Sequence, residues 1–300
     1  MPTDPDPAAP DDFLHRFQLE RAGVRGALVR LEQSWQRIGA NADYAPPLAD
    51  LLGQTVAASA LFTSAIKFDG RLSIHLRDSG PLRLLFADCT HDGRLRGIVR
   101  WEGVPPSAEV GLDPAARLAI TIENRATDAR YQGLVPVEGA RLAQAFEGYF
   151  ERSEQLPTRI VLATDGDRCG GIMLQQIAGS GGTVAGDADG WNRVGHLLAT
   201  LRSDELLRLP PEQVLLRLFH EEGVRLQPAQ PLVFECTCSR TRVADMLRSL
   251  GRAESDSVLA EQGSVDVTCE FCNRRYVFDE ADIGEVFADM RPTTDGPTRH

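Results

Sequence analysis

Four cysteines near the C-terminus of this 300-residue chain form two close pairs, Cys236-Thr237-Cys238 and Cys269-Glu270-Phe271-Cys272. Two such thiolate pairs make up the ligand set of a tetrahedral all-cysteine zinc site. Cys236 and Cys238 project to the same side of an extended segment because they are two residues apart. We therefore predict one Zn²⁺ per chain, held by Cys236, Cys238, Cys269 and Cys272.

Two structural disulfides are the alternative use of these thiols, and they would require an oxidising compartment. Residues Met1 to Asp12 are acidic and proline-rich and lack the features of a signal peptide, so we interpret them as a disordered tail. The most apolar stretch, Thr55 to Ile66, is shorter than the roughly 20 residues that span a bilayer. We expect a soluble, cytoplasmic protein with no membrane partner and normally reduced thiols.

The charge of the chain argues against nucleic acid as a partner. The formal net charge is -11. Between Glu235 and Asp289 the sequence has 12 acidic residues against six arginines, a net charge of -6 around the cysteines. Such a module repels a phosphate backbone, so a zinc ribbon that binds nucleic acid is disfavoured.

The sequence also argues against an enzyme. A catalytic zinc keeps one coordination position open, whereas four cysteines fill the shell. No phosphate-binding loop, nucleophile elbow or zinc-protease helix is present, and no two histidines are spaced as metal ligands. The six histidines of the chain are His15, His75, His91, His196, His220 and His300. We interpret the remaining cysteines, Cys89 and Cys169, as small buried side chains and assign them no role.

A redox switch is the function that best fits a closed zinc-thiolate site. Zinc holds the sulfurs as thiolates, the form that oxidants attack, while shielding them by coordination. Oxidation to disulfides would release the metal and with it the folding free energy that the metal supplies. A zinc-ribbon regulatory protein and a thiol-disulfide oxidoreductase remain as alternatives.

The rest of the chain predicts an α+β protein: an N-terminal mixed core with an antiparallel β-meander and helices, a helical linker and a small C-terminal four-cysteine zinc module. Phe13 to Leu31 is ambiguous between strand and helix, and Pro46 to Phe68 has the apolar spacing of a buried helix. An amphipathic helix is expected at Ala140 to Glu154. Period-two patterns predict a meander of four strands. Its strands are expected at Arg71–Leu76, Leu82–Phe86, Leu95–Trp101 and Leu118–Ile122, with further strands at Arg130–Val137, Pro157–Ala163 and Gly170–Ile177.

Three domains follow from this pattern: a core at residues 13–177, a flexible and helical linker at 178–231, and a redox-switch zinc-binding domain at 232–290. The glycine-rich stretch Ala178 to Gly190 is typical of a flexible linker. Trp191 to Leu209 and Pro211 to Glu222 carry leucines at helical spacing. These helices are too short to be stable alone, so we expect them to dock on another part of the protein.

Several motifs resemble the 33 kDa chaperonin (heat shock protein 33) family over about residues 13–290. The cysteine motifs Glu235–Arg240 and Val267–Cys272, followed by Tyr276-Val277-Phe278, are similar to its zinc module. Further similar stretches are Val24–Gly26, Lys67–Gly70, Tyr149-Phe150, Ser153–Thr158, Gly170–Gln175 and Phe219–Glu222.

The resemblance implies a redox-regulated holdase that is idle when reduced and zinc-bound. It implies that the oxidised disulfides join Cys236 to Cys238 and Cys269 to Cys272. It also implies that the linker at about Gly190 to Gln230 then detaches from the part of the protein on which it docks and exposes apolar surface. That surface would capture unfolded or misfolded client proteins, with activation coupled to formation of a homodimer.

Overall fold

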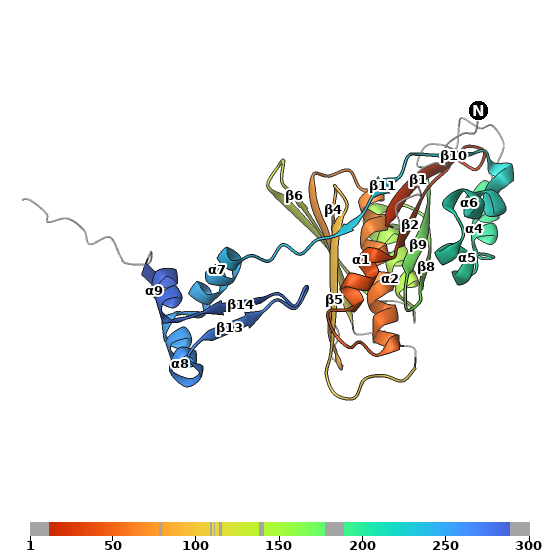
Figure 1. Ribbon diagram of the computed structural model, residues 1–300. Helices are drawn as coiled ribbons and strands as arrows, with labels where there is room; N and C mark the ends of the chain where they lie inside the picture. The colour runs from red at the N-terminus through yellow and green to blue at the C-terminus, as the bar shows by residue number, and fades with distance from the viewer. Residues whose placement is uncertain are drawn as a thin grey trace, which may run out of the picture. The chain divides into compact units, whose positions relative to one another are not determined.

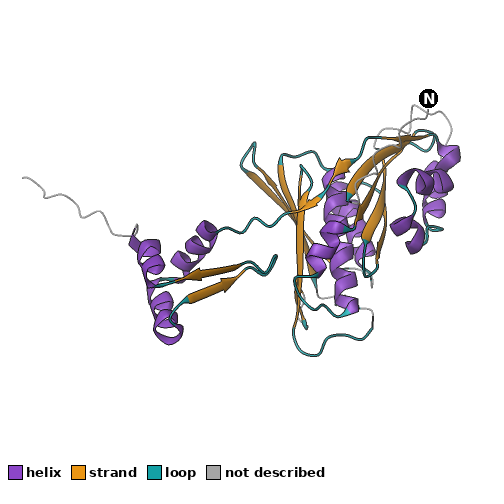
Figure 2. Cartoon of the chain, in the orientation of Figure 1, coloured by secondary structure: helices purple, strands orange, loops and turns teal. Residues whose placement is uncertain are grey.

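The structure is a computed structural model that describes residues 12–77, 80–108, 110, 112–113, 116–137, 141–177 and 189–288. The chain divides between Glu235 and Cys236 into two compact units, which are described separately. Both units contain helices and strands, as Figure 2 shows, and these occur in separate runs along the chain. The α+β class predicted from the sequence is therefore confirmed.

One six-stranded sheet of the first unit joins the two ends of that unit. Its order is β10-β1-β2-β9-β8, with β11 also pairing with β1. The N-terminal segment that the sequence left ambiguous thus forms two antiparallel strands. The strands are β1 (Phe13–Leu19), β2 (Val24–Leu31), β8 (Thr158–Thr164), β9 (Cys169–Gln176), β10 (Val224–Leu226) and β11 (Gln230–Pro231).

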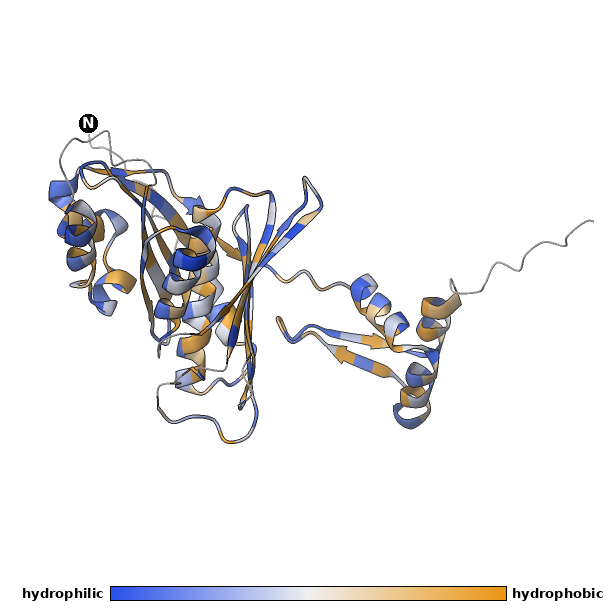
Figure 3. Cartoon of the chain, turned by 180° about the vertical axis from the view of Figure 1, so that it is seen from behind, coloured by the Kyte–Doolittle hydropathy of each residue, from blue (hydrophilic) through white to orange (hydrophobic). Residues whose placement is uncertain are grey.

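The second six-stranded sheet has the order β12-β5-β4-β3-β6-β7. The predicted meander is right for β3, β4 and β5 but wrong for β6, which pairs with β3 on the other side. The outer edge of β5 is instead occupied in part by β12, which runs parallel to it. Hydrophilic and hydrophobic residues alternate along several of these strands (Figure 3). The strands are β3 (Gly70–Arg77), β4 (Leu82–Thr90), β5 (Arg94–Trp101), β6 (Arg117–Asn124), β7 (Ala129–Pro136) and β12 (Val233–Phe234).

Helix α2 (Pro46–Ala65) packs against strands of both sheets, as its position in Figure 1 suggests. Two strand glycines let the helix approach closely, because a Cβ at Gly97 would lie 2.6 Å from Val56 and one at Gly171 would lie 2.8 Å from Leu61. Most of the helix is buried, as its apolar pattern predicted. Its surroundings form the larger apolar core of the first unit.

Two further helical segments complete this core. Helix α1 (Gln33–Gly39), which the sequence did not predict, follows β2 directly. The helix expected at Ala140–Glu154 is α3 (Leu142–Tyr149), continued by a π-helical turn at Phe150–Glu154, while Ala140 lies outside the described residues. The π-helical turn ends at Gln155, which has a left-handed φ of 54°.

Three short helices and a 3-10 turn cover the opposite face of the first sheet (Figure 1). Their buried leucines pack on Phe13, Phe17 and Leu28. The expectation that the linker helices pack against another part of the protein is therefore confirmed. The glycine-rich stretch predicted at Ala178 to Gly190 lies outside the described residues as far as residue 188. The helical elements are α4 (Gly190–Leu198), α5 (Ser203–Arg208), α6 (Pro211–Phe219) and the turn at His220–Glu222.

The second unit is a β-hairpin with three helices. The strands β13 and β14 pair antiparallel, with Val265 opposite Phe278 and Thr268 opposite Arg275. A single small apolar cluster joins the hairpin to the helices. The elements are α7 (Arg240–Leu250), α8 (Arg252–Gln262), β13 (Val265–Thr268), β14 (Arg275–Phe278) and α9 (Glu280–Ala288). Among the described residues of the whole chain, no helix is long and apolar enough to cross a bilayer.

Candidate metal centre

The first thiol pair lies in the extended segment just before α7. Ser239 ends this segment, and its hydroxyl accepts a hydrogen bond from the backbone N–H of Arg242 at 3.2 Å. This is an N-cap, so the sequence fixes the start of the helix immediately after Cys238. The Arg242 guanidinium also donates to the Thr237 carbonyl at 2.8 Å, which ties the residue between the two cysteines to the helix.

The second thiol pair occupies the tip of the β13–β14 hairpin. Cys269 donates its backbone N–H to the Arg274 carbonyl at 2.9 Å, and its own carbonyl accepts from Asn273 at 2.8 Å. The chain turns at Asn273, which has a φ of 54°. Asparagine tolerates this left-handed conformation better than most residues with a side chain. The hairpin thereby holds Cys269 and Cys272 on one tight turn.

The fold brings all four predicted cysteines together. Their Sγ atoms lie within 4.8 Å of one another, with 3.6 Å between Cys236 and Cys269 and 3.3 Å between Cys238 and Cys272. Four sulfurs at about 2.3 Å from a tetrahedral zinc ion would be about 3.8 Å apart. The arrangement therefore has the donor type and the size to hold one such ion. All four residues are partly buried, and each is a free thiol in this structure.

Tyr276 and Arg274 on the hairpin surround the sulfurs with further polar groups. The Tyr276 hydroxyl donates a hydrogen bond to the Sγ of Cys238 at 3.1 Å. Burial alone would raise the pKa of the Cys238 thiol, but the hydrogen bonds from Tyr276 and the neighbouring thiols outweigh it and lower the pKa to about 7. The pKa of the Arg274 guanidinium is raised by Tyr276 and by the charges of Cys238 and Cys272. The hydrogen bond from Tyr276 thus favours thiolate at Cys238, the form that binds a metal. Burial and the hydrogen bonds among the thiols instead raise the pKa of Cys236 and Cys272.

Arg240 fastens the helix next to the first thiol pair onto the hairpin. Its guanidinium donates to the Val277 carbonyl at 2.8 Å, pairs with Asp282 at 2.7 Å and lies 4.1 Å from the centroid of the Phe278 ring. These contacts link α7, β14 and α9. The sequence included Arg240 and Tyr276 in family-like motifs but gave neither a role, because their partners are 37 or more residues away.

The other two cysteines lie in the core of the first unit. Cys89 and Cys169 are completely buried, and desolvation raises the pKa of both thiols. Burial makes such thiols unreactive, in agreement with their interpretation as small core residues. Five of the six histidines lie among the described residues, and in that part of the chain none joins a cluster of metal ligands.

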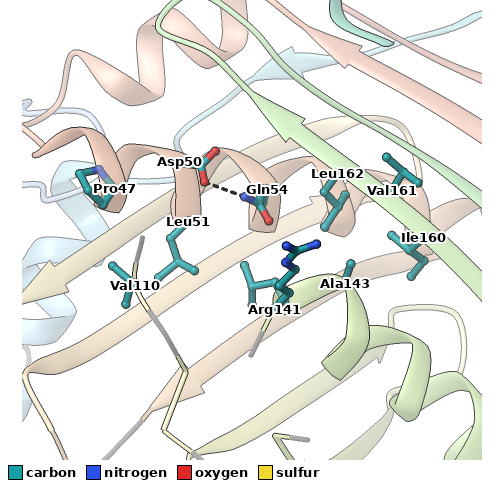
Figure 4. Close-up of a pocket in the computed structure, with 11 residues that line it drawn as sticks. Pro47, Asp50, Leu51, Gln54, Val110, Arg141, Ala143, Ile160, Val161 and Leu162 are labelled. Atoms are coloured by element: carbon teal, nitrogen blue, oxygen red, sulfur yellow. Dashed lines mark hydrogen bonds between the residues drawn. The ribbon is translucent and has the colours of Figure 1, made fainter. Parts of the chain in front are cut away.

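The first unit also contains a hollow of about 300 Å³ between α2, α3 and β8. Figure 4 shows the Gln54 amide hydrogen-bonded to the Asp50 carboxylate, at 2.8 Å, beside Arg141 and a wall of aliphatic side chains. The residues described around this hollow include no serine, cysteine or histidine that could act as a nucleophile or a proton-transfer base.

The chain is similar to known proteins over most of its length. A family model described as Hsp33 protein matches residues 12–279. A 33 kDa chaperonin of Nitrosococcus oceani is 42% identical over 290 residues, covering 96% of this chain and 99% of the relative. One of Ectopseudomonas mendocina is 43% identical over 295 residues, covering 97% and 100%. The crystal structure of the 33 kDa chaperonin (heat shock protein 33 homolog) of Thermotoga maritima shares the fold, with a TM-score of 0.76, 22% identity, and coverage of 93% of this chain and 99% of that one.

Proposed function

The chain belongs to the Hsp33 protein family, and we propose that it is a cytoplasmic, redox-regulated holdase whose switch is a zinc ion bound by Cys236, Cys238, Cys269 and Cys272. The observation that carries the proposal is the convergence of these four thiols within 4.8 Å of one another. In the reduced protein, the bound zinc would hold the hairpin tip and the segment before α7 together and keep the chaperone idle.

Oxidation changes the four sulfurs in pairs. One thiolate of a pair attacks a peroxide and becomes a sulfenic acid, and its partner then displaces hydroxide to form the disulfide. We propose Cys236–Cys238 and Cys269–Cys272 as the pairs. Each disulfide consumes one equivalent of peroxide, and the sulfurs cease to be metal ligands.

Loss of the metal would have a large structural consequence, because the described part of the second unit has a single small apolar cluster of its own. We propose that this unit unfolds and that the helices α4 to α6 then leave the first sheet. The segment from Val224 to Glu235 connects these helices to the first thiol pair along the chain. The released face would include Phe17, Leu28 and Phe219, which are buried in the docked state.

Client proteins would bind to this exposed apolar surface, without nucleotide and without catalysis. Activated chains would associate as homodimers, since apolar surface shared between two copies limits further association. This proposal makes the protein a chaperone and not an enzyme, as the names of the relatives suggest.

The test measures zinc content and suppression of client aggregation in the same preparation, before and after peroxide treatment. Light scattering of a thermally unfolding client should decrease only with the oxidised protein, and a reductant with added zinc should reverse the effect. The double variant Cys89→Ser, Cys169→Ser is the matched control, because it removes two thiols outside the cluster.

Equal suppression by reduced, zinc-loaded protein and by oxidised protein would refute the holdase switch. Rapid exchange with a small disulfide substrate, well above the rate of a free thiol, would favour the oxidoreductase alternative. Specific binding of nucleic acid without client protection would favour a zinc-ribbon regulator.

A further inference from the structure

A hollow of about 180 Å³ lies on the face of the first sheet that packs against α2. Its polar lining comes from two arginines, three glutamines and a serine, and the described residues that line it include no carboxylate. This is unusual for a chain with a net charge of -11. The polar lining residues are Arg16, Gln18, Arg25, Ser64, Gln175 and Gln227.

The strand register places the two arginines on one face. Arg16 lies opposite Ala27, and Arg25 is two residues before Ala27 on the same strand. The two arginines are therefore diagonal neighbours, about 7–8 Å apart at their backbones and within reach of each other's long side chains. Two like charges in such positions repel each other unless an anion lies between them.

The hydrogen bonds of both guanidinium groups go to neutral oxygens. Arg16 donates to the Gln230 side chain at 2.9 Å. Arg25 donates to the Gln175 side chain at 3.0 and 3.2 Å and to the Ala65 carbonyl at 3.4 Å. Neither arginine forms an ion pair within the described chain, and desolvation lowers the pKa of Arg16. Both positive charges are thus half-buried without a counter-charge from the described residues.

We propose that this hollow is a binding site for a small phosphate-type oxyanion, either free phosphate or the terminal phosphate of a small metabolite. Guanidinium groups match the geometry of such an anion and form short, strong, charge-assisted hydrogen bonds to it. The volume is below the roughly 300–1,000 Å³ of sites for drug-sized ligands, which favours a ligand of this size over a whole nucleotide. The proposal does not depend on the chaperone function.

Binding there would also stabilise the segment that follows β10. Gln227 lines the hollow, its backbone N–H donates to the Arg16 carbonyl at 2.8 Å, and its carbonyl lies 3.0 Å from Nδ1 of His15. A ligand that contacts both the sheet and Gln227 would slow the opening of this segment.

Titration of the full-length, reduced, zinc-loaded protein with inorganic phosphate tests the site by calorimetry at constant ionic strength. We expect saturable binding of one phosphate per chain, weakened about tenfold or more by Arg16→Gln or by Arg25→Gln, since each removes charged hydrogen bonds. The matched control is Arg37→Gln, which removes an exposed arginine of α1 outside the hollow. A parallel titration with glycerol phosphate separates the two ligand sources, and binding of either supports the site.

Absence of saturable phosphate binding by the wild-type protein overturns the proposal, and so does unchanged affinity in both pocket variants. Hydrogen exchange of the wild-type protein gives a measurement that does not depend on how the variants fold. Added phosphate should slow exchange in β1, β2 and residues 224–230, and unchanged exchange there would also count against the site.

Discussion

Two apolar clusters stabilise the unit before Cys236, one on each face of its first sheet, whereas the unit after Glu235 has a single cluster. Among the described residues that single cluster contains nine buried side chains, and two of the four cysteines pack at its edge. A core this small rarely supplies more than about 3–5 kcal/mol. From this difference we expect the first unit to fold by burial of apolar surface and the second to need a metal bound by its thiol cluster.

The two units also differ in the exposure and the pKa of their thiols. The thiols of the first unit are fully buried, and their pKa values are raised by desolvation. The thiols of the second unit are partly exposed, and the pKa of Cys238 is lowered to about 7, although burial raises the pKa of Cys236 and Cys272. Because of this difference in exposure, we expect oxidants to reach the sulfurs of the second unit and to spare those of the first.

The largest expected effect is the unfolding of the second unit in the Cys269→Ser variant. Structural zinc contributes about 10–16 kcal/mol of apparent binding free energy to small metal-dependent folds. We expect zinc content to fall from one per chain to nearly none, with loss of amide protection in residues 240–288. Zinc analysis and hydrogen exchange measure both effects.

Cys169→Ser is the control for this variant, because Cys169 is completely buried in the first unit. It should keep a full complement of zinc even if its packing suffers. A full complement of zinc in Cys269→Ser would mean that the four thiols are not the metal ligands.

A smaller effect is expected where the linker helices dock on the first sheet. Leu215 in α6 is 1% exposed in the apolar cluster beneath these helices, so Leu215→Ala should cost about 2–5 kcal/mol. We expect helices α4 to α6 to be cleaved first by a protease in the reduced, zinc-loaded protein. The neighbouring Leu216 is 65% exposed, and Leu216→Ala should change stability by about 0.5 kcal/mol or less. Identical cleavage of the two variants would contradict the docking described here.

Next in size is the effect of Tyr276→Phe on metal affinity. The change removes the hydroxyl that donates to Cys238 at 3.1 Å and keeps the buried ring in place. Groups that hydrogen-bond a metal ligand typically change affinity by about 10–100-fold, and we expect a loss in this range. Competition with a chromophoric chelator measures it, with Tyr131→Phe on the half-exposed edge strand β7 as the control. Equal zinc affinity in the two variants would show that the hydroxyl does not support the site.

The sequence predicted those features that depend on local patterns. Cysteine spacing identified all four thiols that the fold brings together, and apolar periodicity predicted α2, most strands and the leucine faces of the linker helices. Features that depend on distant pairings were not predictable in this way. The pairing of β6 with β3, the strand β12 beside β5 and the hydroxyl of Tyr276 beside Cys238 each join segments that no local pattern connects.

Asp12 is the clearest case of such a distant contact, and it corrects the interpretation of Met1 to Asp12 as a disordered tail at its last residue, while residues 1–11 lie outside the described part of the chain. Its side-chain oxygens accept hydrogen bonds from the backbone N–H groups of Glu32, at 2.6 Å, and Ser34, at 2.7 Å. These groups are at the start of α1, where Glu32 itself provides no side-chain cap. The carboxylate thus caps the helix from about 20 residues away, and the aspartate is only 7% exposed.

The smallest predicted effect follows from this cap. Asp12→Asn leaves one acceptor oxygen and places an amide N–H₂ group against a backbone donor, so it should lower the free energy of unfolding by about 1–2 kcal/mol. Denaturant unfolding of the first unit measures the change. Asp43→Asn, an exposed aspartate before α2, is the matched control and should have no measurable effect. An unchanged midpoint for Asp12→Asn would mean that burial of the segment, and not the cap, holds the start of β1 in place.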